Sequence, residues 1–511
     1  MSRMPLAAAT SLLLFSLAAP SAHATFLQQG AKLVGTGAVG NAFQGYSVSL
    51  SADGNTAIVG GASDKIGAGA TWVYTRSAGV WSQQGAKLFG TGAVGTAEQG
   101  VSVSLSADGN TAVVGGYGDN SSRGAAWIFT RSAGVWSQQG TKLVGTGAVG
   151  FAQQGDAVAL SADGNTAVVG GNFDNHGVGA VWVYTRSGSV WSQQGTKLVG
   201  ADAVGIANQG CSVSLSADGN TAVVGGNVDN ANAGAAWVFT RTAGVWSQQG
   251  AKLVGTGAVG AAEQGLSVSL SADGNTAVVG GSRDDSGEGA AWVYNRTGSV
   301  WGQQGAKLVG TTAALSTTAQ GGSVWLSADG NTAVVGGASD NAGAGAAWVF
   351  TRSAGVWSQQ GAKLVGTGAA GAAGQGRSVS LSADGLTAFV CGIFDNSGAG
   401  AAWVFMSDAT TGVPLEPTPR PGVLMATPNP FLCQTSLLLT LPVAEDVEVS
   451  VWDVSGRLVC RMPRASMAAG QHPIPWFGQD DRGQRVKAGI YFVHVRGNSG
   501  LDLCKTVVRL R

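Results

Sequence analysis

The chain has 511 residues, of which 44% are apolar and only 11% charged, and it contains 83 glycines. This composition excludes an acidic disordered chain and a helical bundle, and it favours a glycine-rich all-β protein. The formal net charge is zero, with 29 basic and 29 acidic residues. Because this balance recurs within the repeated unit described below, no basic stripe is expected and nucleic acid is not an expected partner.

The first 24 residues have the three-part pattern of a cleaved secretory signal peptide. Arg3 precedes an apolar run over residues 6–17, and an Ala-His-Ala sequence ends at Ala24. The processed chain is therefore predicted to begin near Thr25. No stretch approaches the roughly 18 apolar residues that a membrane-spanning helix needs. We expect an exported protein, either secreted and extracellular or held at the outer cell surface, without a transmembrane segment.

A block of about 55 residues recurs seven times between Gln28 and Phe405. The sequence QQGxKL begins at residues 28, 83, 138, 193, 248, 303 and 359, so five steps are 55 residues and the last is 56. Strict spacing of this kind indicates one supersecondary unit copied in tandem, with each copy burying its apolar faces against its neighbours.

The second copy shows the expected elements in chain order. Residues 102–114 form two strands joined by an Asp-Gly hairpin turn, because polar and apolar residues alternate before the turn and β-branched residues follow it. A loop containing Asp119 leads to a third strand over residues 126–131, and a Ser-Ala-Gly turn opens a fourth strand at Val135. The unit is therefore predicted to be a four-stranded antiparallel propeller blade.

The two ends of the repeat region complement each other. Residues 26–35 supply a fourth strand before any first strand has occurred, whereas the seventh copy stops after its third strand at Phe405. We therefore expect an all-β fold in which a seven-bladed β-propeller is closed by the N-terminal strand, since this pairing removes an exposed sheet edge.

Tryptophan recurs at two fixed places in the unit. This placement predicts packing between neighbouring sheets, with stacking on a carbohydrate as the alternative. Seven tryptophans occupy the third strand (72, 127, 182, 237, 292, 348 and 403), and six the start of the fourth (81, 136, 191, 246, 301 and 357).

The five cysteines do not define a disulfide framework. Cys211 and Cys391 interrupt repeats that otherwise lack cysteine and are interpreted as isolated substitutions. Cys433 and Cys504 fall near the first and last strands of a C-terminal module, where either a bridge or a lone buried thiol is possible. The pairing of these two residues and Cys460 stays open.

With the blade laid out, the sequence QGxSVSLSADGNTAVVGGxxDNxGAGAAWVF resembles the FG-GAP repeat of integrin-α-like propellers over roughly residues 26–406. Gln99-Gly100 and Gly115-Gly116 stand where that repeat has Phe-Gly and Gly-Ala-Pro. The Gly-His and Trp-Asp signatures of WD propellers are missing.

The resemblance implies a possible calcium site, because many FG-GAP members bind calcium between the first two strands. In the second copy this short turn offers only Asp108 and Asn110 as oxygen ligands, and the turns of the other copies are equally short. Calcium is therefore not supported, and no cofactor is predicted. The second aspartate of each blade is expected to form an Asx-turn, with a bound cation as the alternative. These aspartates are residues 64, 119, 174, 229, 284, 340 and 395.

The C-terminal part is predicted to be a separate module. Residues 407–427 are rich in Pro and Thr and form an expected linker. Residues 428–511 then carry PNPF, VEVSVWD and GIYF in order, which resembles the Ig-like domain of FlgD-like hook-cap proteins and of type IX secretion sorting domains. The resemblance implies contact with secretion machinery, through sorting or anchoring. The predicted order is signal peptide 1–24, propeller 25–406, linker and Ig-like domain.

No catalytic constellation is indicated. After removal of the signal peptide only His176, His472 and His494 remain, and the acids that are not repeated are scattered over different blades. We therefore expect a protein that is not an enzyme. An exported hydrolase or lyase acting at the propeller channel is one alternative, and a structural surface protein without a discrete ligand is another.

Differences among the copies indicate a binding face. In an antiparallel blade, the loops between strands two and three and between blades lie on one face of the ring, and most variation falls in these loops. A mixed aromatic and charged patch is typical of specific binding, whereas drift at loop tips is the alternative. The candidate contacts are Tyr46, Tyr117, Phe173, His176, Arg283 and Arg377. We expect a monomeric adhesion protein that binds an extracellular protein or glycan through this face.

Overall fold

The computed structural model describes residues 25–313, 317–408, 423–441, 444–454, 456–468, 470–497 and 501–510. The predicted signal peptide lies outside these residues. The chain divides into two compact units, Met1–Thr411 and Gly412–Arg511, each of which is described by itself below. None of the helices found among the described residues is long and apolar enough to cross a membrane.

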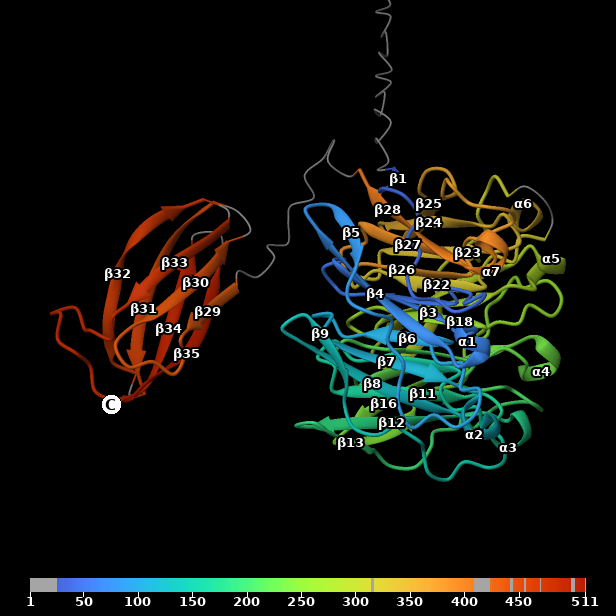
Figure 1. Ribbon diagram of the computed structural model, residues 1–511, viewed down its shortest axis with the longest axis horizontal. Coiled ribbons are helices and arrows are strands. Elements are labelled where there is room, and N and C mark those ends of the chain that lie inside the picture. Colours follow the sequence, from blue (N-terminus) through green and yellow to red (C-terminus); the bar gives the residue numbers. More distant parts are fainter. Residues whose placement is uncertain are drawn as a thin grey trace, which may run out of the picture. The chain divides into compact units, whose positions relative to one another are not determined.

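The first unit consists of seven four-stranded antiparallel sheets, or blades (Figure 1). The first strands are β2 (Ser47–Leu50), β6 (Ser102–Leu105), β10 (Ala157–Leu160), β14 (Ser212–Leu215), β18 (Ser267–Leu270), β22 (Ser323–Leu326) and β26 (Ser378–Leu381). The second strands are β3 (Thr56–Gly61), β7 (Thr111–Gly116), β11 (Thr166–Gly171), β15 (Thr221–Gly226), β19 (Thr276–Gly281), β23 (Thr332–Gly337) and β27 (Thr387–Gly392). Successive blades are numbered 1 to 7 in this order.

The outer strands complete each blade. The third strands are β4 (Ala70–Ser77), β8 (Ala125–Ser132), β12 (Ala180–Ser187), β16 (Ala235–Thr242), β20 (Ala290–Thr297), β24 (Ala346–Ser353) and β28 (Ala401–Ser407). The fourth strands of blades 1 to 6 are β5 (Val80–Gln83), β9 (Val135–Gln138), β13 (Val190–Gln193), β17 (Val245–Gln248), β21 (Val300–Gln303) and β25 (Val356–Gln359). The all-β architecture predicted from the repeats is confirmed.

Blade 7 takes its fourth strand from the start of the described chain. Strand β1 (Phe26–Gln28) pairs antiparallel with β28, with Phe26 opposite Ser407 and Gln28 opposite Phe405. Blades 7 and 1 also meet at their turns, where the Ala383 amide donates to the Ala52 carbonyl at 3.0 Å. The equivalent bond recurs between other neighbouring blades, so this seam has the same backbone contact as the others.

The segment between the second and third strands forms a single helical turn rather than the expected open loop. Three consecutive residues of each turn have a positive φ, as Asn120 (51°), Ser121 (57°) and Ser122 (64°) do in the second blade. In Figure 1 the turns α3 to α7 lie along one side of the propeller, opposite the β9 and β13 hairpins. The turns are α1 (Asp64–Gly67), α2 (Asp119–Ser122), α3 (Asp174–Gly177), α4 (Asp229–Asn232), α5 (Asp284–Gly287), α6 (Asp340–Gly343) and α7 (Asp395–Gly398).

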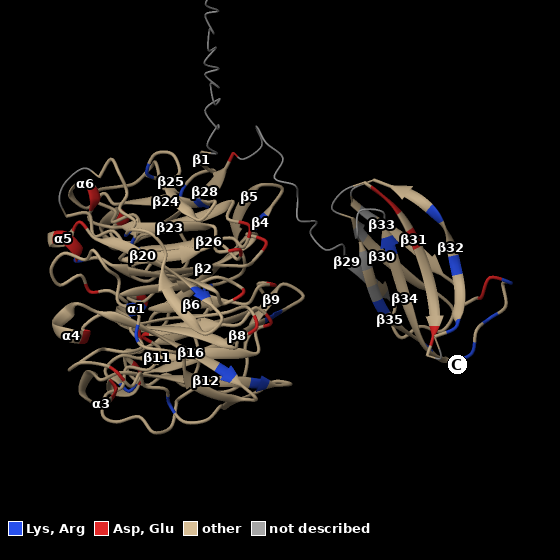
Figure 2. Ribbon diagram, turned by 180° about the vertical axis from the view of Figure 1, so that it is seen from behind, with Lys and Arg blue, Asp and Glu red and all other residues tan. Residues whose placement is uncertain are grey.

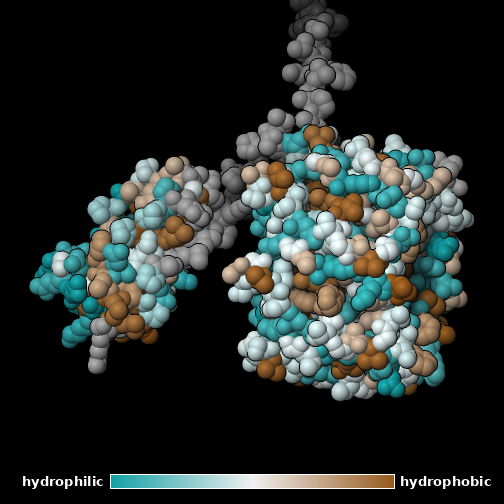
Figure 3. Space-filling model, viewed as in Figure 1, coloured by the Kyte–Doolittle hydropathy of each residue, from teal (hydrophilic) through white to brown (hydrophobic). Residues whose placement is uncertain are grey.

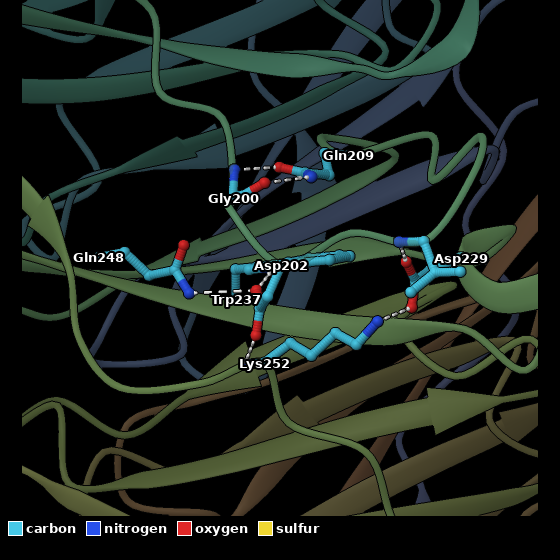
Figure 4. Close-up of polar contacts among 8 residues, drawn as sticks. Gly200, Asp202, Gln209, Asp229, Trp237, Gln248 and Lys252 are labelled. Atoms are coloured by element: carbon cyan, nitrogen blue, oxygen red, sulfur yellow. Dashed lines mark hydrogen bonds and ion pairs between the residues drawn. The ribbon is translucent and has the colours of Figure 1, made fainter.

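The aspartate that opens each helical turn forms a buried ion pair, not the expected Asx-turn. In blade 4, Asp229 accepts a hydrogen bond from the Lys252 ammonium at 2.6 Å and from the Val204 amide at 2.7 Å (Figure 4). The carboxylate is fully buried, and an ammonium is the partner that compensates its lost hydration best. The lysine lies just after the fourth strand of the same blade, where Leu253 bridges back to Ala236 of β16, so the ion pair holds this connecting segment against its own blade.

This ion pair recurs in all seven blades and also joins the two ends of the repeat region. Lys32, close to β1, pairs with Asp395 of blade 7 at 2.6 Å. The other pairs are Lys87 with Asp64, Lys142 with Asp119, Lys197 with Asp174, Lys307 with Asp284 and Lys363 with Asp340. Acidic residues (red) accordingly mark α4, α5 and α6 in Figure 2. The balance of charge seen in the sequence therefore has a local structural cause.

The third-strand tryptophans pack between neighbouring segments as predicted. Trp72 is fully buried, and its indole N–H donates to the Thr36 carbonyl at 2.8 Å. Gly35 lies against this ring, since a Cβ on Gly35 would approach the Trp72 Cδ1 to 2.1 Å. The fourth-strand tryptophans are half-buried beneath arginines, as Arg131 lies over the Trp136 ring at 5.4 Å from its centroid. Both sets are therefore structural parts of the blades.

Exposed apolar residues on the propeller are scattered. Figure 3 shows them as separate brown spots over the visible face. The most regular of them are the valines that open the fourth strands, such as Val135 and Val190, which are 70% and 68% exposed. Isolated exposed apolar residues of this kind are ordinary for a protein surface.

The second unit is a two-sheet sandwich. One sheet has the order β29 (Val423–Thr427), β30 (Thr435–Leu441) and β33 (Gly470–Trp476). The other has the order β32 (Leu458–Met467), β31 (Glu445–Asp453), β34 (Gly489–Gly497) and β35 (Asp502–Arg509). Phe431, Leu437, Val449, Trp476 and Val493 lie in its buried core.

The structure changes the predicted linker and adds to the open question of the cysteines. The linker expected over residues 407–427 is shorter at both ends, because Ser407 ends β28 and Val423–Thr427 pair with β30 as β29. The rest of that segment lies outside the described residues. Cys433 is free and exposed, and Cys460 is also free. The side chain of Cys504 lies outside the described residues.

Candidate functional site

A cavity of about 550 Å³ lies on the axis of the propeller. The seven first strands line it, together with the residue that precedes each of them. These strands follow one another around the axis, and β2 contacts β26 as well as β6. This volume falls within the range of small-ligand sites.

Serines hold the walls of this cavity together. The Ser49 hydroxyl accepts a hydrogen bond from the Leu105 amide of the next blade at 3.0 Å, and the Ser104 hydroxyl accepts one from Leu160 at 3.1 Å. Most of the polar atoms on the first strands therefore serve neighbouring blades. Side chains at the cavity mouth are the ones available to a ligand.

The residue before each first strand forms a ring at the mouth, and this mouth ring differs in every blade. The corresponding Gln-Gly that precedes it is constant. The mouth ring consists of Tyr46, Val101, Asp156, Cys211, Leu266, Gly322 and Arg377. Seven equivalent backbone positions thus carry seven different residues, six with side chains and one glycine, which gives the cavity a chemically specific opening on a symmetric frame.

Two of the predicted contact residues meet in this mouth ring. The Arg377 guanidinium lies over the Tyr46 ring, 4.7 Å from its centroid. Stacking of this kind fixes the guanidinium while leaving its edge N–H groups free to donate. Both side chains are half-buried and line the axial cavity.

Asp156 is the carboxylate that lines the cavity. Burial raises its pKa to about 7, the Arg377 charge opposes this shift, and the Glu98 charge adds to it. Asp156 belongs to blade 3 and Arg377 to blade 7, so they stand on opposite sides of the ring. Asp156 was not among the predicted contacts, because nothing in its local sequence shows that the backbone directs it at the axis.

Tyr117 stands beside this group. Burial and a hydrogen bond to Glu98 raise the pKa of Tyr117, and the charges of Tyr46 and Asp156 contribute to the same shift. Glu98 has a left-handed backbone (φ 55°), as do the equivalent residues of the other blades. The mouth therefore has an acidic side, formed by Glu98 and Asp156, and a basic side at Arg377.

Three asparagines add amide groups to the cavity lining: Asn172, Asn208 and Asn227. The Oδ1 atom of Asn172 is buried and has no hydrogen-bond partner among the described residues. An orphaned acceptor of this kind is costly unless a donor reaches it. Asn172 follows β11 in the same blade as Asp156, so blade 3 supplies two acceptors at one side of the mouth.

The remaining predicted contacts lie away from the cavity lining. Phe173 precedes α3 and is 49% exposed, and His176 is exposed within α3. The Arg283 side chain is 70% exposed and lies 3.9 Å from Glu263. These three residues are on the same face as the mouth ring but outside it.

Trp325 is a further cavity residue that the sequence prediction missed. Trp325 lies in β22 at the position that serine occupies in most other first strands. It lines the axial cavity and packs partly against the core of the next blade. Comparison of the seven copies at this single position could have indicated it.

The aspartate of each strand one–two turn already has partners. Asp108 accepts hydrogen bonds from the Ser106 hydroxyl at 2.5 Å and the Asn110 amide at 2.9 Å. Burial raises the pKa of Asp108, but these bonds and the Arg131 charge outweigh it, so the net pKa is lowered. Within the described part of the chain, no group of three His, Cys, Asp or Glu side chains is arranged to hold a metal ion.

We expect Asp156→Asn to stabilise the propeller at pH 8. The pKa of Asp156 is about 7 in the folded protein, above its ordinary value of 3.8. Between pH 3.8 and pH 7 the folded state therefore keeps the proton of Asp156, whereas the unfolded chain has lost it. Stability therefore falls as pH rises through this window. The variant should gain about 1–2 kcal/mol at pH 8 and nothing at pH 4, as measured by urea unfolding.

Asp163→Asn is the matched control, because Asp163 lies in the same blade. Burial raises its pKa, but hydrogen bonds from Ser161 and Asn165 lower it further, so its net shift is opposite. This variant should lose stability at pH 8. An equal response of both variants to pH would contradict the assigned environment of Asp156.

The Ig-like sandwich has a second hollow, of about 460 Å³, on the sheet of β31, β32 and β34. Trp452, Phe492 and His494 line it, and the Arg461 guanidinium lies 3.5 Å from the Glu448 carboxylate at its edge.

Comparison with known proteins identifies the C-terminal unit. Residues 435–500 match the family model of the FlgD Ig-like domain, and the sandwich is therefore a FlgD Ig-like domain. Among solved structures, hydrazine synthase of Kuenenia stuttgartiensis is similar with a TM-score of 0.47 and 13% identity, covering 74% of this chain and 98% of that chain. No curated protein is significantly similar in sequence to this chain.

Proposed function

We propose that this protein is a secreted or cell-surface binding and adhesion protein that recognises its ligand at the mouth of the axial cavity. The observation that carries the proposal is the mouth ring, where seven equivalent positions hold seven different residues above a cavity of about 550 Å³. An extracellular glycan or protein group is the ligand class that follows from the predicted export.

The composition of the cavity favours binding over hydrolysis. Among the described residues that line it, Asp156 is the single carboxylate, and the serines of the first strands are engaged between blades. Hydrolases that use paired carboxylates need two at the reacting bond. A non-catalytic role is therefore the better account of this lining.

The C-terminal domain and the repeats extend the proposal. The FlgD Ig-like domain serves export or surface attachment through secretion machinery, in the manner of type IX sorting domains, and the repeats are of the FG-GAP type. Strand β1 closes the propeller by completing blade 7. These three assignments are supported by the predicted signal peptide, by the repeat pattern and by the β1–β28 pairing, respectively.

We expect the triple variant Tyr46→Ala, Tyr117→Ala, Arg377→Ala to lose binding on the order of tenfold or more toward any glycan or protein found by array screening of the wild type. The matched control is Val135→Ser, Val190→Ser, Val245→Ser, which alters three exposed residues on the hairpin face. The control should bind within about twofold of wild type. Equal binding by both triple variants would place the ligand elsewhere.

A further inference from the structure

We propose that the mouth of the axial cavity binds a short zwitterionic ligand of peptide type, with its ammonium group at Asp156 and Asn172 and its carboxylate at Arg377. The inference rests on the proposed function and names the chemical class of its ligand. A free dipeptide or tripeptide has both charges at the required ends.

The acidic side of the mouth requires a donor. Asp156 is a desolvated carboxyl, and the Asn172 Oδ1 in the same blade is a buried acceptor without a partner. Two acceptors that face one cavity repel an anion and are satisfied together by a group with several N–H donors. A primary ammonium has three such donors and a positive charge.

The basic side requires an acceptor. Arg377 forms no ion pair with the described residues, and its guanidinium is held flat against Tyr46. A planar guanidinium with free N–H groups is suited to a carboxylate, which it binds in bidentate geometry. The mouth ring thus offers one site for an anion.

The two sites are separated by the width of the mouth. Blades 1 and 2 lie between Asp156 and Arg377 on one side, and blades 4 to 6 on the other. The two charges nevertheless act on each other across the opening, since Arg377 lowers the pKa of Asp156. A ligand that contacts both groups must therefore carry opposite charges at its two ends, with a short spacer between them.

The cavity volume sets the upper size. About 550 Å³ accommodates a few amino-acid residues and excludes a folded partner from the axis. The three asparagines supply amide donors and acceptors beside the spacer, as a peptide backbone would require. Tyr117, held by Glu98, borders the same side as Asp156.

The test is calorimetric titration of the full chain with glycine, diglycine, triglycine and tetraglycine at pH 8. We expect one member longer than glycine to bind best. Its N-acetylated and C-amidated forms should each bind at least about tenfold more weakly, since each lacks one ion pair. In the Asp156→Asn variant the free and N-acetylated peptides should bind with equal affinity. In the Arg377→Gln variant the free and C-amidated peptides should bind with equal affinity.

The protonation of Asp156 provides a second readout. The groups that act on it are Arg377 and Glu98, with Tyr117 and Cys211 also coupled to it. From pH 8 to pH 6 the ionised fraction of Asp156 falls about tenfold, while the protonated fraction of the peptide amine, whose ordinary pKa is near 8, rises about twofold. Because the ion pair needs both charges, binding should weaken about fivefold in wild type and should not weaken in Asp156→Asn.

The zwitterion assignment and the proposed function can fail separately in these experiments. Binding of the doubly blocked peptide as tightly as the free peptide, or no binding of any member, overturns the zwitterion assignment. If a glycan or protein still binds and loses affinity in the Tyr46, Tyr117 and Arg377 triple variant, the proposed function stands without it. If the triple variant binds every ligand normally, both fail.

Discussion

Deleting residues 25–33 is expected to destabilise the propeller by roughly 5 kcal/mol or more, the largest effect of any change considered. The deletion removes β1 from the edge of β28 and takes Lys32 from the buried Asp395 carboxylate. It also removes the paired backbone bonds between Leu33 and Ala402, at 2.7 and 3.0 Å. An unpaired buried charge and an open sheet edge both act against the folded ring.

The measurement is the urea unfolding midpoint of the truncated and full propellers. A synthetic peptide of residues 25–35 should restore the midpoint when added in trans, because the strand and its lysine are then supplied again. Leu27→Ser is the matched control, since Leu27 is 60% exposed within β1 and should be nearly neutral. A truncated chain that unfolds at the wild-type midpoint would show that β1 does not close the ring.

Asp284→Ala is expected to cost about 3–5 kcal/mol. Asp284 is 1% exposed and accepts hydrogen bonds from the Lys307 ammonium and from the Val259 amide at 2.7 Å. Its removal leaves a partly buried ammonium and an amide without an acceptor. The loss arises from these unpaired groups, because the side chain itself contributes little apolar burial.

The adjacent residue provides the control for this prediction. Asp285 is exposed in the same helical turn and has a left-handed backbone (φ 47°), which Asn tolerates and which Asn occupies in blade 2 as Asn120. Asp285→Asn should therefore change the unfolding free energy by less than about 0.5 kcal/mol. Similar losses for both variants would mean that the ion pair of Asp284 contributes nothing specific.

The blades were predictable from the sequence because local patterns determine them. An Asp-Gly turn between alternating and β-branched residues specifies the first hairpin, and tryptophan at a constant offset specifies inter-blade packing. The partner of the second aspartate was not predictable in this way. Lys252 lies 23 residues beyond Asp229, and the two meet because the chain after β17 folds back on β16, where Leu253 pairs with Ala236.

The candidate site was predictable in part. Variation among the copies indicated Tyr46 and Arg377, which the structure brings together, but it also indicated Phe173 and His176, which lie outside the cavity. Asp156 was not distinguished from its neighbours, because its role depends on desolvation at the axis rather than on a local motif. The sequence alone does not distinguish a variable residue that is exposed at a loop tip from one that points toward the axis.

The pairing of β1 with β28 brings the two ends of the repeat region together, which bears on circular permutation of the propeller. The Asp408 amide donates to the Thr25 carbonyl at 2.8 Å. The equivalent pair in blade 1 is Ser77 and Val80, which the two-residue turn Ala78-Gly79 joins. A two-residue linker between Asp408 and Thr25 would thus restore a seventh hairpin of the same type. If β1 closes the propeller as we propose, the repeat region is equivalent to a circle opened at one of seven corners, and circular permutants opened at another corner should preserve its architecture.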